Sequence, residues 1–362
     1  MSTIDSPSTS DPFADHPEHA YHELRVARVI DETPDARSII FEIPEALARA
    51  FRYKAGQFLT LKVPHEGQDL VRCYSLASSP DCESEHKVTI KRVADGRISN
   101  RINDELRPGD VVKVLPPGGL FTLNDGENPV LLFGGGSGIT PVISIIKTVL
   151  ATTGRRLKLV YANRDDASII FKAELEALQA KHGDRLEIVH SLDAVDGFVD
   201  LARAREQLEG WEDAEVYVCG PAAFMEVVEE ALGAASFDTD RIHIEKFVSP
   251  PDPDKAAEAY AEQAAEIGGD DPHEVTICLD GKELQVPYEK GQTVLVAAQK
   301  AGLEPPFSCT DGFCGCCMAK LEDGEVEMIN NDFLSKREVE DRWVLTCQSV
   351  PTTAKCKIRY PD

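Results

Sequence analysis

Apolar and polar positions alternate over short stretches in the first third of the chain. The stretches LRVARVI, SIIFEI, QFLTLKV, VRCYSL and KVTIKRV are rich in β-branched residues, and Pro, Gly and Asp separate them. Many short strands without long helices between them are typical of a barrel or a sandwich. The pattern therefore predicts an all-β domain over residues 22–126.

After this region, strand-like segments alternate with longer segments whose apolar residues have the spacing of a helix. Strand-like VLLF, LKLVYAN, LEIVHSL, EVYVCG and RIHIEKF alternate with VISIIKTVL, SIIFKAELEALQAKH, LARAREQLE and FMEVVEEALGAA, which have helical spacing. Such alternation indicates a parallel sheet with helices on both faces. We assign residues 127–247 to this α/β domain.

The pattern changes twice more. Residues 248–272 are rich in Pro, Ala and acidic residues and lack an apolar stripe, so they are predicted to be an acidic linker, partly helical over AEAYAEQAAE. Residues 273–362 combine short strands with one helix over TVLVAAQKAGL and predict a small α+β domain. Residues 1–21 have no basic start and no apolar core, and are predicted to be a disordered tail.

Charge and composition exclude several function classes. The 362 residues carry a net charge of −25, which argues against binding to nucleic acid or to an anionic membrane surface. No apolar run approaches the roughly 20 residues of a membrane helix. The acidity fits either plain solubility or a basic protein partner. Ten cysteines without a secretory signal predict a cytoplasmic protein, where clustered cysteines bind metals more often than they form disulfides.

Four cysteines near the C-terminus have the spacing of iron ligands. Cys309, Cys314 and Cys317 form a C-x4-C-x2-C motif, and Cys347 follows after a gap. This is the plant-type pattern that holds a [2Fe–2S] cluster. Zinc is the alternative, but zinc sites usually pair two C-x2-4-C motifs of similar spacing. Cys316 could ligate in another register, although the spacing favours it as a spectator.

The segment RCYSLASSP, inside the predicted β domain, resembles the flavin motif R-x-Y-S of the ferredoxin–NADP reductase superfamily. The resemblance implies that Arg72 neutralises a flavin pyrophosphate and that Tyr74 offers its ring to the isoalloxazine. Ser75 would bond the N5 edge of the flavin. The resemblance to this superfamily favours FAD over FMN.

A second segment, KRVADGRISNRI, resembles the other flavin segment of the same superfamily. There, backbone amides and a hydroxyl would meet the flavin pyrophosphate. The resemblance implies Gly96, Ile98 and Ser99 as binding residues, and places Lys91 on the strand beside the flavin.

The segment GGGSGITP follows a predicted strand and opens a predicted helix. This is the context of a phosphate-binding turn at a helix N-terminus. The candidate residues are Gly135, Gly136 and Gly138, which lack Cβ atoms, and Thr140, which carries a hydroxyl. A plain connector between strand and helix is the alternative, but the spacing matches the version of this turn in the reductase superfamily.

The segment VYVCGPAAFM resembles the second nicotinamide signature of the superfamily. The resemblance implies that Cys219, at a strand end, lies near the nicotinamide C4 and shapes hydride transfer together with Ser75. The other expected pocket residues are Gly220, Pro221 and Met225. Phe247 would either cover the flavin or anchor the linker.

The segment VYANRDDASIIF bears on the choice of dinucleotide. A 2′-phosphate needs basic residues, and here Arg164 is followed at once by Asp165 and Asp166, which would repel it. NADH is therefore expected, although Arg164 alone could still accept NADPH.

The order of the three domains resembles the reductase components of bacterial oxygenases. The resemblance implies an antiparallel β-barrel for FAD, a nucleotide-binding α/β domain and a β-grasp ferredoxin domain. Electrons would pass from NADH through FAD and the [2Fe–2S] cluster to a terminal oxygenase.

The expected oxygenase follows from three segments. YANRDDASIIF, RIHIEKF and LTCQS are most similar to the reductases of 3-ketosteroid 9α-monooxygenases, with those of phenylacetyl-CoA epoxidases second. A Rieske-type steroid 9α-hydroxylase is thus the expected partner. The alternatives are another oxygenase, a general NAD(P)H:acceptor reductase, and a flavin reductase whose C-terminal domain is a redox sensor or a structural metal site.

Overall fold

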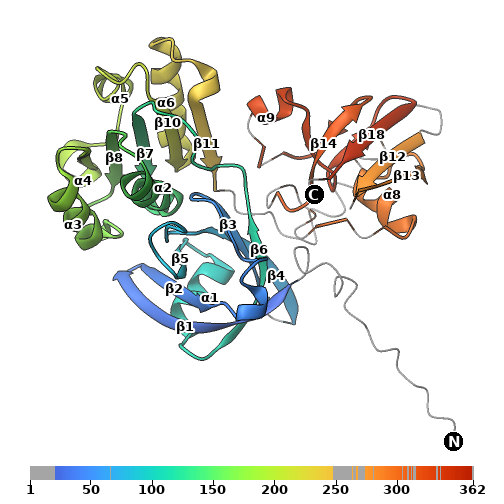
Figure 1. The fold of residues 1–362 in the computed structure, drawn as a ribbon, viewed down its shortest axis with the longest axis horizontal. Helices are drawn as coiled ribbons and strands as arrows, with labels where there is room; N and C mark the ends of the chain where they lie inside the picture. The colour runs from blue at the N-terminus through green and yellow to red at the C-terminus, as the bar shows by residue number, and fades with distance from the viewer. Residues whose placement is uncertain are drawn as a thin grey trace, which may run out of the picture.

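The protein folds into three β-containing parts, which Figure 1 shows as a ribbon. The computed structural model describes residues 21–65, 67–247, 263, 266–267, 274–279, 281–303, 305–307, 310, 312, 315–331, 333–334 and 336–360. Two predicted iron ligands, Cys309 and Cys314, lie outside the described residues. So do the predicted tail up to residue 20 and most of the predicted linker.

The first part is an antiparallel barrel, as predicted. Six strands lie in the order β4-β3-β6-β1-β2-β5, and every neighbouring pair is antiparallel. A bridge between Leu76, just after β4, and Val88 of β5 closes the sheet on itself. The strands are β1 (His22–Thr33), β2 (Ala36–Glu42), β3 (Phe58–His65), β4 (Gln68–Ser75), β5 (His86–Lys91) and β6 (Val111–Gly118).

The interior of the barrel is apolar. Leu24, Ile39 and Leu61 are completely buried there, as the alternating pattern of their strands requires. Helix α1 (Arg97–Glu105) adds Ile98 and Ile102 to the same core. A short 3₁₀ helix, η1 (Glu45–Leu47), lies between β2 and β3.

The second part is the predicted parallel sheet. Its order is β11-β10-β7-β8-β9, and all four pairs are parallel. Successive residues of β7 face opposite sides, since Leu132 packs in the core under α2 whereas Leu131 and Phe133 pack under α6. The elements are β7 (Val130–Gly135), α2 (Ile139–Thr152), β8 (Leu157–Asn163), α3 (Lys172–His182), β9 (Leu186–Leu192), α4 (Asp193–Asp196), α5 (Leu201–Glu206), β10 (Glu215–Gly220), α6 (Ala222–Ala234), η4 (Thr239–Arg241) and β11 (Ile242–Lys246).

One predicted helix begins later than its sequence pattern indicates. The segment SIIFKAELEALQAKH is helical only from Lys172, because Ile169, Ile170 and Phe171 are all buried in the core ahead of the helix. Three consecutive apolar residues cannot lie on one helix face. Phe171 adopts a left-handed conformation with φ of 61°, and this residue redirects the chain into α3.

The third part is a small mixed sheet with one covering helix. The order is β13-β12-β18-β14-β16, with β12 and β18 parallel and the other pairs antiparallel. Helix α8 buries Val294, Ala297 and Ala298 against the sheet. The elements are β12 (Glu274–Leu279), β13 (Lys282–Pro287), α8 (Val294–Lys300), β14 (Met318–Asp323), β15 (Val326–Met328), α9 (Lys336–Glu340), β16 (Trp343–Leu345), β17 (Ser349–Pro351) and β18 (Lys355–Arg359).

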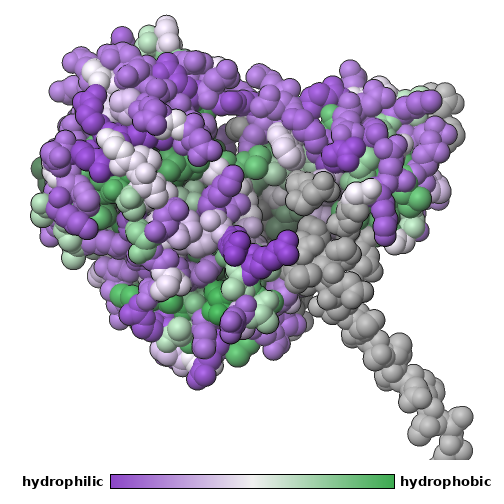
Figure 2. All heavy atoms as spheres, in the orientation of Figure 1, coloured by the Kyte–Doolittle hydropathy of each residue, from purple (hydrophilic) through white to green (hydrophobic). Residues whose placement is uncertain are grey.

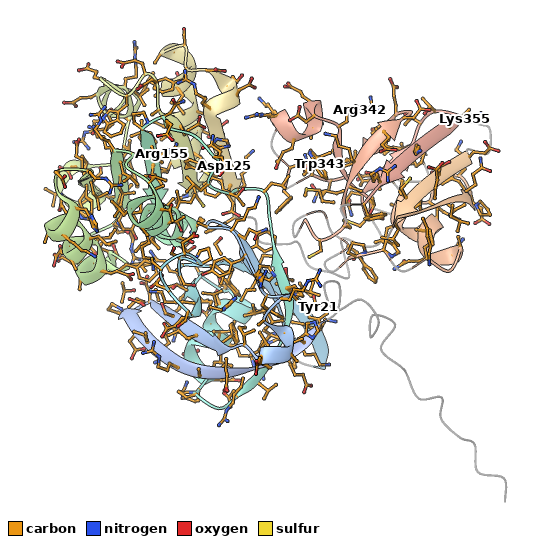
Figure 3. The ribbon with its side chains drawn as sticks, in the orientation of Figure 1. Tyr21, Asp125, Arg155, Arg342, Trp343 and Lys355 are labelled. Atoms are coloured by element: carbon orange, nitrogen blue, oxygen red, sulfur yellow. The ribbon has the colours of Figure 1, made fainter. Side chains whose placement is uncertain are left out.

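Side chains outside the regular elements fix several of the chain's connections (Figure 3). Arg155 is 4 % exposed and donates to main-chain carbonyls of Asn124 and Asn128, in the segment that joins the barrel to the parallel sheet. Tyr21 lies under Lys62 of β3, whose Nζ is 3.9 Å from the ring centroid. Hydrophilic side chains cover most of the face seen in Figure 2.

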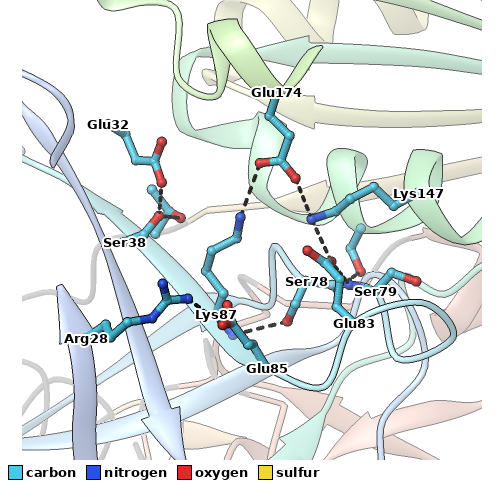
Figure 4. A network of polar contacts seen from close by, with 12 residues as sticks. Arg28, Glu32, Ser38, Ser78, Ser79, Glu83, Glu85, Lys87, Lys147 and Glu174 are labelled. Carbon is cyan, nitrogen blue, oxygen red and sulfur yellow. Dashed lines mark hydrogen bonds and ion pairs between the residues drawn. The ribbon is translucent and has the colours of Figure 1, made fainter. Parts of the chain in front are cut away.

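A partly buried polar network joins the barrel to the parallel-sheet domain (Figure 4). Lys147 of α2, with a side chain only 5 % exposed, lies 2.8 Å from Glu83 of the barrel and 3.0 Å from Glu174 of α3. Lys87 of β5 lies 3.2 Å from the second oxygen of Glu174. These four charged groups therefore fix the two domains against each other.

Candidate functional site

The residues of the R-x-Y-S motif lie together on β4, opposite β3. Ser75 is 2 % exposed, and its hydroxyl donates to Glu245 Oε2 at 3.3 Å. Tyr74 packs against the barrel core. Arg72 Nη1 donates to the carbonyl of Val71 at 2.6 Å. The barrel thus presents the motif toward the end of β11, in the neighbouring domain.

Glu245 is a site residue that sequence reasoning missed. It pairs in register with Cys219 across β10 and β11, which places it beside two predicted catalytic side chains. Burial raises the pKa of Glu245 to about 8, against the opposing effect of its hydrogen bond from Ser75. The only sequence signal is a carboxylate that follows two alternating isoleucines near the end of the strand in RIHIEKF.

Cys219 is completely buried at the end of β10. Burial, and then the charge of Glu245, raises the pKa of the Cys219 thiol well above its usual value. The side chain therefore stays protonated at neutral pH, and a protonated thiol is a poor nucleophile.

The raised pKa of Glu245, a half-buried residue, predicts a pH-dependent stability difference. Because the folded-state pKa of Glu245 exceeds the unfolded value of 4.5, its ionisation destabilises the fold progressively as the pH rises from 4.5 toward about 8. We expect Glu245→Gln to raise the melting temperature relative to wild type more at pH 9 than at pH 5. The exposed Glu226→Gln, measured by the same thermal melts, should show no such difference. Equal shifts at both pH values would contradict the raised pKa.

The glycine turn meets the end of β10. β7 ends at Gly135, the 3₁₀ helix η2 (Gly136–Gly138) follows, and α2 begins at Ile139. A Cβ atom on Gly138 would lie 2.1 Å from the carbonyl oxygen of Cys219, so only glycine permits this approach. Gly136 has a φ of +52°. A Cβ on Gly135 would lie 2.7 Å from Pro221, which follows Gly220. The turn and the VYVCGP segment therefore share one edge of the sheet.

Two predicted pocket residues have other contacts. Thr140 is buried and its hydroxyl donates to the carbonyl of Ser137 at 3.0 Å, within its own turn. Met225 is 4 % exposed and packs in the core beneath α6. Both side chains hold the turn and helix in place. Phe247, directly after β11, is 44 % exposed.

Helices α1 and α2 begin without a side-chain cap. Their N-cap residues are Gly96 and Gly138, which have no side chain to accept from the first N–H groups. By contrast, Asp200 caps α5 and Thr293 caps α8. The uncapped start of α1 suits an anion such as a phosphate, whereas the first N–H of α2, that of Ile139, already donates to the carbonyls of Gly136 and Ser137.

The second flavin segment forms the start of α1. Ser99 is buried, and its Oγ accepts from the N–H of Val93 at 3.2 Å, which holds the segment against the helix. Ile98 is 1 % exposed and lies in the barrel core. The N–H of Gly96 itself donates to the carbonyl of Val93 at 2.9 Å, so the uncapped donors at the start of α1 belong to the residues that follow Gly96.

Asp35 links two predicted cofactor residues across the two domains. Its Oδ2 lies 3.9 Å from Nζ of Lys91 on β5 and 3.1 Å from Nη2 of Arg164, which follows β8. Burial lowers the pKa of Lys91, while the nearby Asp35 opposes this shift. Asp165 and Asp166 have local partners instead, since Asp165 caps η3 (Asp166–Ser168) and Asp166 pairs with Lys172.

The predicted iron-ligand segment brings two cysteines together in the third part. Cys317 and Cys347 are 2 % and 6 % exposed and belong to one apolar cluster with Leu295 and Leu345. Thr346 donates to the carbonyl of Cys317 from its N–H at 3.1 Å and from its hydroxyl at 2.9 Å. Two thiols distant in sequence thus become neighbours in a dry environment, and a thiol donor set of this kind fits an iron–sulfur cluster.

Three family models match the chain in the order of these parts. The oxidoreductase FAD-binding domain matches residues 23–123, the oxidoreductase NAD-binding domain residues 132–230, and the 2Fe-2S iron-sulfur cluster binding domain residues 277–352. The ferredoxin reductase component of 3-ketosteroid-9-alpha-monooxygenase from Rhodococcus rhodochrous is 40% identical over 93% of this chain and 96% of its own length. The chain belongs to the ferredoxin reductase components of monooxygenases. It is an oxidoreductase of FAD, NADH and a [2Fe–2S] cluster that serves an oxygenase partner.

More distant relatives of this reductase family agree. One component of the 1,2-phenylacetyl-CoA epoxidase of Escherichia coli is 32% identical over 94% of this chain and 98% of its own length. The solved structure of phthalate dioxygenase reductase covers 97% of this chain and 100% of its own, at 24% identity and a TM-score of 0.59, which shows a shared fold. Within the described part of the chain, no helix has the length and apolarity to span a membrane.

Proposed function

We propose that this reductase delivers electrons from NADH to a Rieske-type 3-ketosteroid 9α-hydroxylase, and so takes part in steroid breakdown. The observation that carries the proposal is the 40% identity to the R. rhodochrous component over nearly the whole of both chains. We infer that it acts in the cytoplasm, with domains at residues 22–126, 127–247 and 273–362.

The residues on the barrel fit a bound FAD. Arg72 and the open N–H groups at the start of α1, next to Gly96, would hold the pyrophosphate. Tyr74 and Ser75 would lie along the ring system, with Ser99 and Ile98 shaping the segment beneath them and Lys91 at the domain boundary. Phe247 would cover the exposed face of the ring.

The end of the parallel sheet fits the dinucleotide. The turn of Gly135, Gly136 and Gly138 would receive the pyrophosphate at the N-terminus of α2. Cys219, Gly220 and Pro221 would border the nicotinamide. Cys317 and Cys347, with Cys309 and Cys314, would hold the cluster. The FAD and the cluster that these residues would hold would supply hydride acceptance from NADH and then transfer of single electrons.

The chain's own residues order the site. Ser75 donates to Glu245, which fixes the hydroxyl between the barrel and the parallel sheet. Glu245, with its pKa raised to about 8 by burial, retains a proton at neutral pH and adds no charge beside the thiol of Cys219. The buried Cys219 excludes water from the same place.

Asp35 supports NADH over NADPH. It neutralises Arg164 and would itself repel a 2′-phosphate. We expect Asp35→Asn to raise the ratio of kcat/KM for NADPH over NADH by up to about tenfold, since tenfold corresponds to the loss of one modest charge interaction. Asp31→Asn, which removes only a surface pair with Arg37, is the control. A ratio that stays at the wild-type value would place the 2′ position away from Arg164.

Reconstitution tests the proposed partner. The reductase is mixed with a purified 3-ketosteroid 9α-hydroxylase, and steroid hydroxylation per NADH is measured. Coupled turnover much faster than the reduction of cytochrome c supports the proposal. The epoxidase of phenylacetyl-CoA, tested in parallel, serves as the second candidate because of the 32% identity to one of its components. Equal activity with cytochrome c and with both oxygenases would indicate a general acceptor reductase.

A further inference from the structure

The iron–sulfur part rests directly on strand β3 of the barrel. Thr60 Oγ1 of β3 lies 3.6 Å from Cys316 Sγ, and the ring of Phe58 meets the ring of Phe333 edge to face with centroids 5.9 Å apart. A Cβ atom on Gly315, whose φ is +71°, would lie 2.4 Å from the Phe333 ring. Phe333 therefore lies against the backbone just before Cys316, and both contacts belong to one surface.

A cavity of about 290 Å³ lies between the two parts at this surface. Gln57, Thr60 and Leu115 line it from the barrel. Pro306, Phe307 and Met318 line it from the other side. The two parts are thus loosely packed between the Thr60–Cys316 and Phe58–Phe333 pairs. Loose packing of this kind fits an interface that can form and dissociate better than a permanent core.

On the barrel side, the contact residues flank the predicted flavin motif. Phe58 pairs in register with Ser75, and Thr60 pairs with Cys73, the residue between Arg72 and Tyr74. The Thr60 hydroxyl also lies 3.4 Å from Cys73 Sγ. One strand therefore separates the motif on β4 from the iron–sulfur part.

On the other side, Cys316 directly precedes the predicted ligand Cys317 in the sequence. A short sequence of contacts consequently runs from Cys73 through Thr60 to Cys316 and the ligand that follows it. A further anchor lies at α9, where Arg337 donates to the carbonyl of Asp240 and lies 3.8 Å from its carboxylate. Figure 1 shows α9 on the side of the iron–sulfur part that faces the parallel sheet.

We propose that the contact between Thr60 and Cys316 is where electrons enter the cluster, and that the Phe58–Phe333 pair positions it. This rests on the proposed roles of β4 and of Cys317. NADH supplies two electrons, so two transfers cross the contact per NADH. Each transfer would take one electron from the reduced flavin and reduce one ferric ion of the cluster to ferrous, and the cluster would pass that electron to the oxygenase partner before it accepts the second. Cys316 is a positioning residue in this scheme, and a thiol hydrogen bond gives it a function that a spectator lacks.

Stopped-flow spectroscopy of the holoprotein tests the proposal. Thr60→Val and Cys316→Ala should leave reduction of the flavin by NADH unchanged and slow the subsequent reduction of the cluster about tenfold, because each removes one hydrogen bond that holds the docked arrangement. Cys316→Ser, which keeps a donor, should restore much of the rate. Cys82→Ala, an exposed cysteine of the barrel, is the control. Unchanged cluster reduction in Thr60→Val and Cys316→Ala would overturn the proposal.

Two further readouts separate the possible failures. The iron content and the electron paramagnetic resonance spectrum of the dithionite-reduced Cys316→Ala protein should match wild type. Loss of iron or an altered spectrum would make Cys316 a ligand and overturn the positioning role. If NADH fails to reduce the flavin of the wild-type protein, the proposed function fails instead.

Cross-linking tests the geometry without turnover. In a Cys73→Ser background, Thr60→Cys should form a disulfide with Cys316 under mild oxidation, detected by mass spectrometry. The linked protein should still reduce its cluster from NADH. Lys62→Cys, further along β3, should not form this link. Absence of the disulfide from Thr60→Cys, or a linked protein with an unreducible cluster, would overturn the proposal.

Discussion

Replacing Cys347 by serine is expected to abolish electron transfer to one-electron protein acceptors while flavin-dependent reduction of ferricyanide by NADH continues. Cys347 is 6 % exposed and packs among the same apolar residues as Cys317. Among the described residues of this apolar group, no further cysteine could replace Cys347 as an iron ligand. Removing a residue that only hydrogen-bonds to a metal ligand already lowers metal affinity or activity by about 10- to 100-fold. Removal of a direct ligand should therefore lower reduction of protein acceptors by more than about 100-fold.

The matched control for this experiment is Cys356→Ser. Cys356 is 2 % exposed on β18 and packs in the other apolar cluster of the same part. It should keep the visible absorbance of the cluster and the full rate with protein acceptors. Bleaching of that absorbance by anaerobic NADH is the measurement for both variants. A Cys347→Ser protein with normal absorbance and a normal rate would place the fourth ligand elsewhere.

The sequence predicted the regular elements well because their patterns are local. Alternation over VRCYSL and continuous apolar character over VLLF follow from how a half-buried and a fully buried strand meet their neighbours. The barrel, the parallel sheet with helices on both faces and the helix from Val294 all follow such patterns. Phe171 shows the limit, since its left-handed backbone is imposed by burial of three apolar residues and not by local spacing.

The site was predictable only where a motif carries the chemistry. Ser75 and Cys219 were predicted from their segments, and their roles stay predictions. Glu245 was not predicted, because its position beside them arises from pairing with Cys219 in one domain and from the hydroxyl of Ser75 in another. Asp35 was missed for the same reason, since Arg164 lies far from it in sequence. Contacts between domains leave no periodic signal in either segment.

Lys147→Met is expected to destabilise the junction of the first two domains by about 3–5 kcal/mol, the range for removing one partner of a buried ion pair. The side chain of Lys147 is 5 % exposed between Glu83 and Glu174, and both carboxylates would lose their shared cation. Burial alone would raise the pKa of Glu174, but Lys147 and Lys87 hold it below its usual value. The ion pairs therefore stabilise the junction at neutral pH, and this contribution is lost as the pH falls through the lowered pKa.

The contrast with an exposed pair makes the measurement decisive. Lys172, with a side chain 43 % exposed, lies 2.6 Å from Asp166, and Lys172→Met should cost no more than about 1 kcal/mol. Urea unfolding is followed by the change in flavin fluorescence as the flavin dissociates. Together with amide hydrogen exchange of α2 and β5, this measurement would locate the loss of stability at the junction. Lys147→Met combined with Glu83→Gln should recover part of the stability, because Glu83 loses its cation in Lys147→Met whereas Glu174 keeps Lys87. Equal losses from Lys147→Met and Lys172→Met would mean that water reaches the network and that apolar packing holds the domains together.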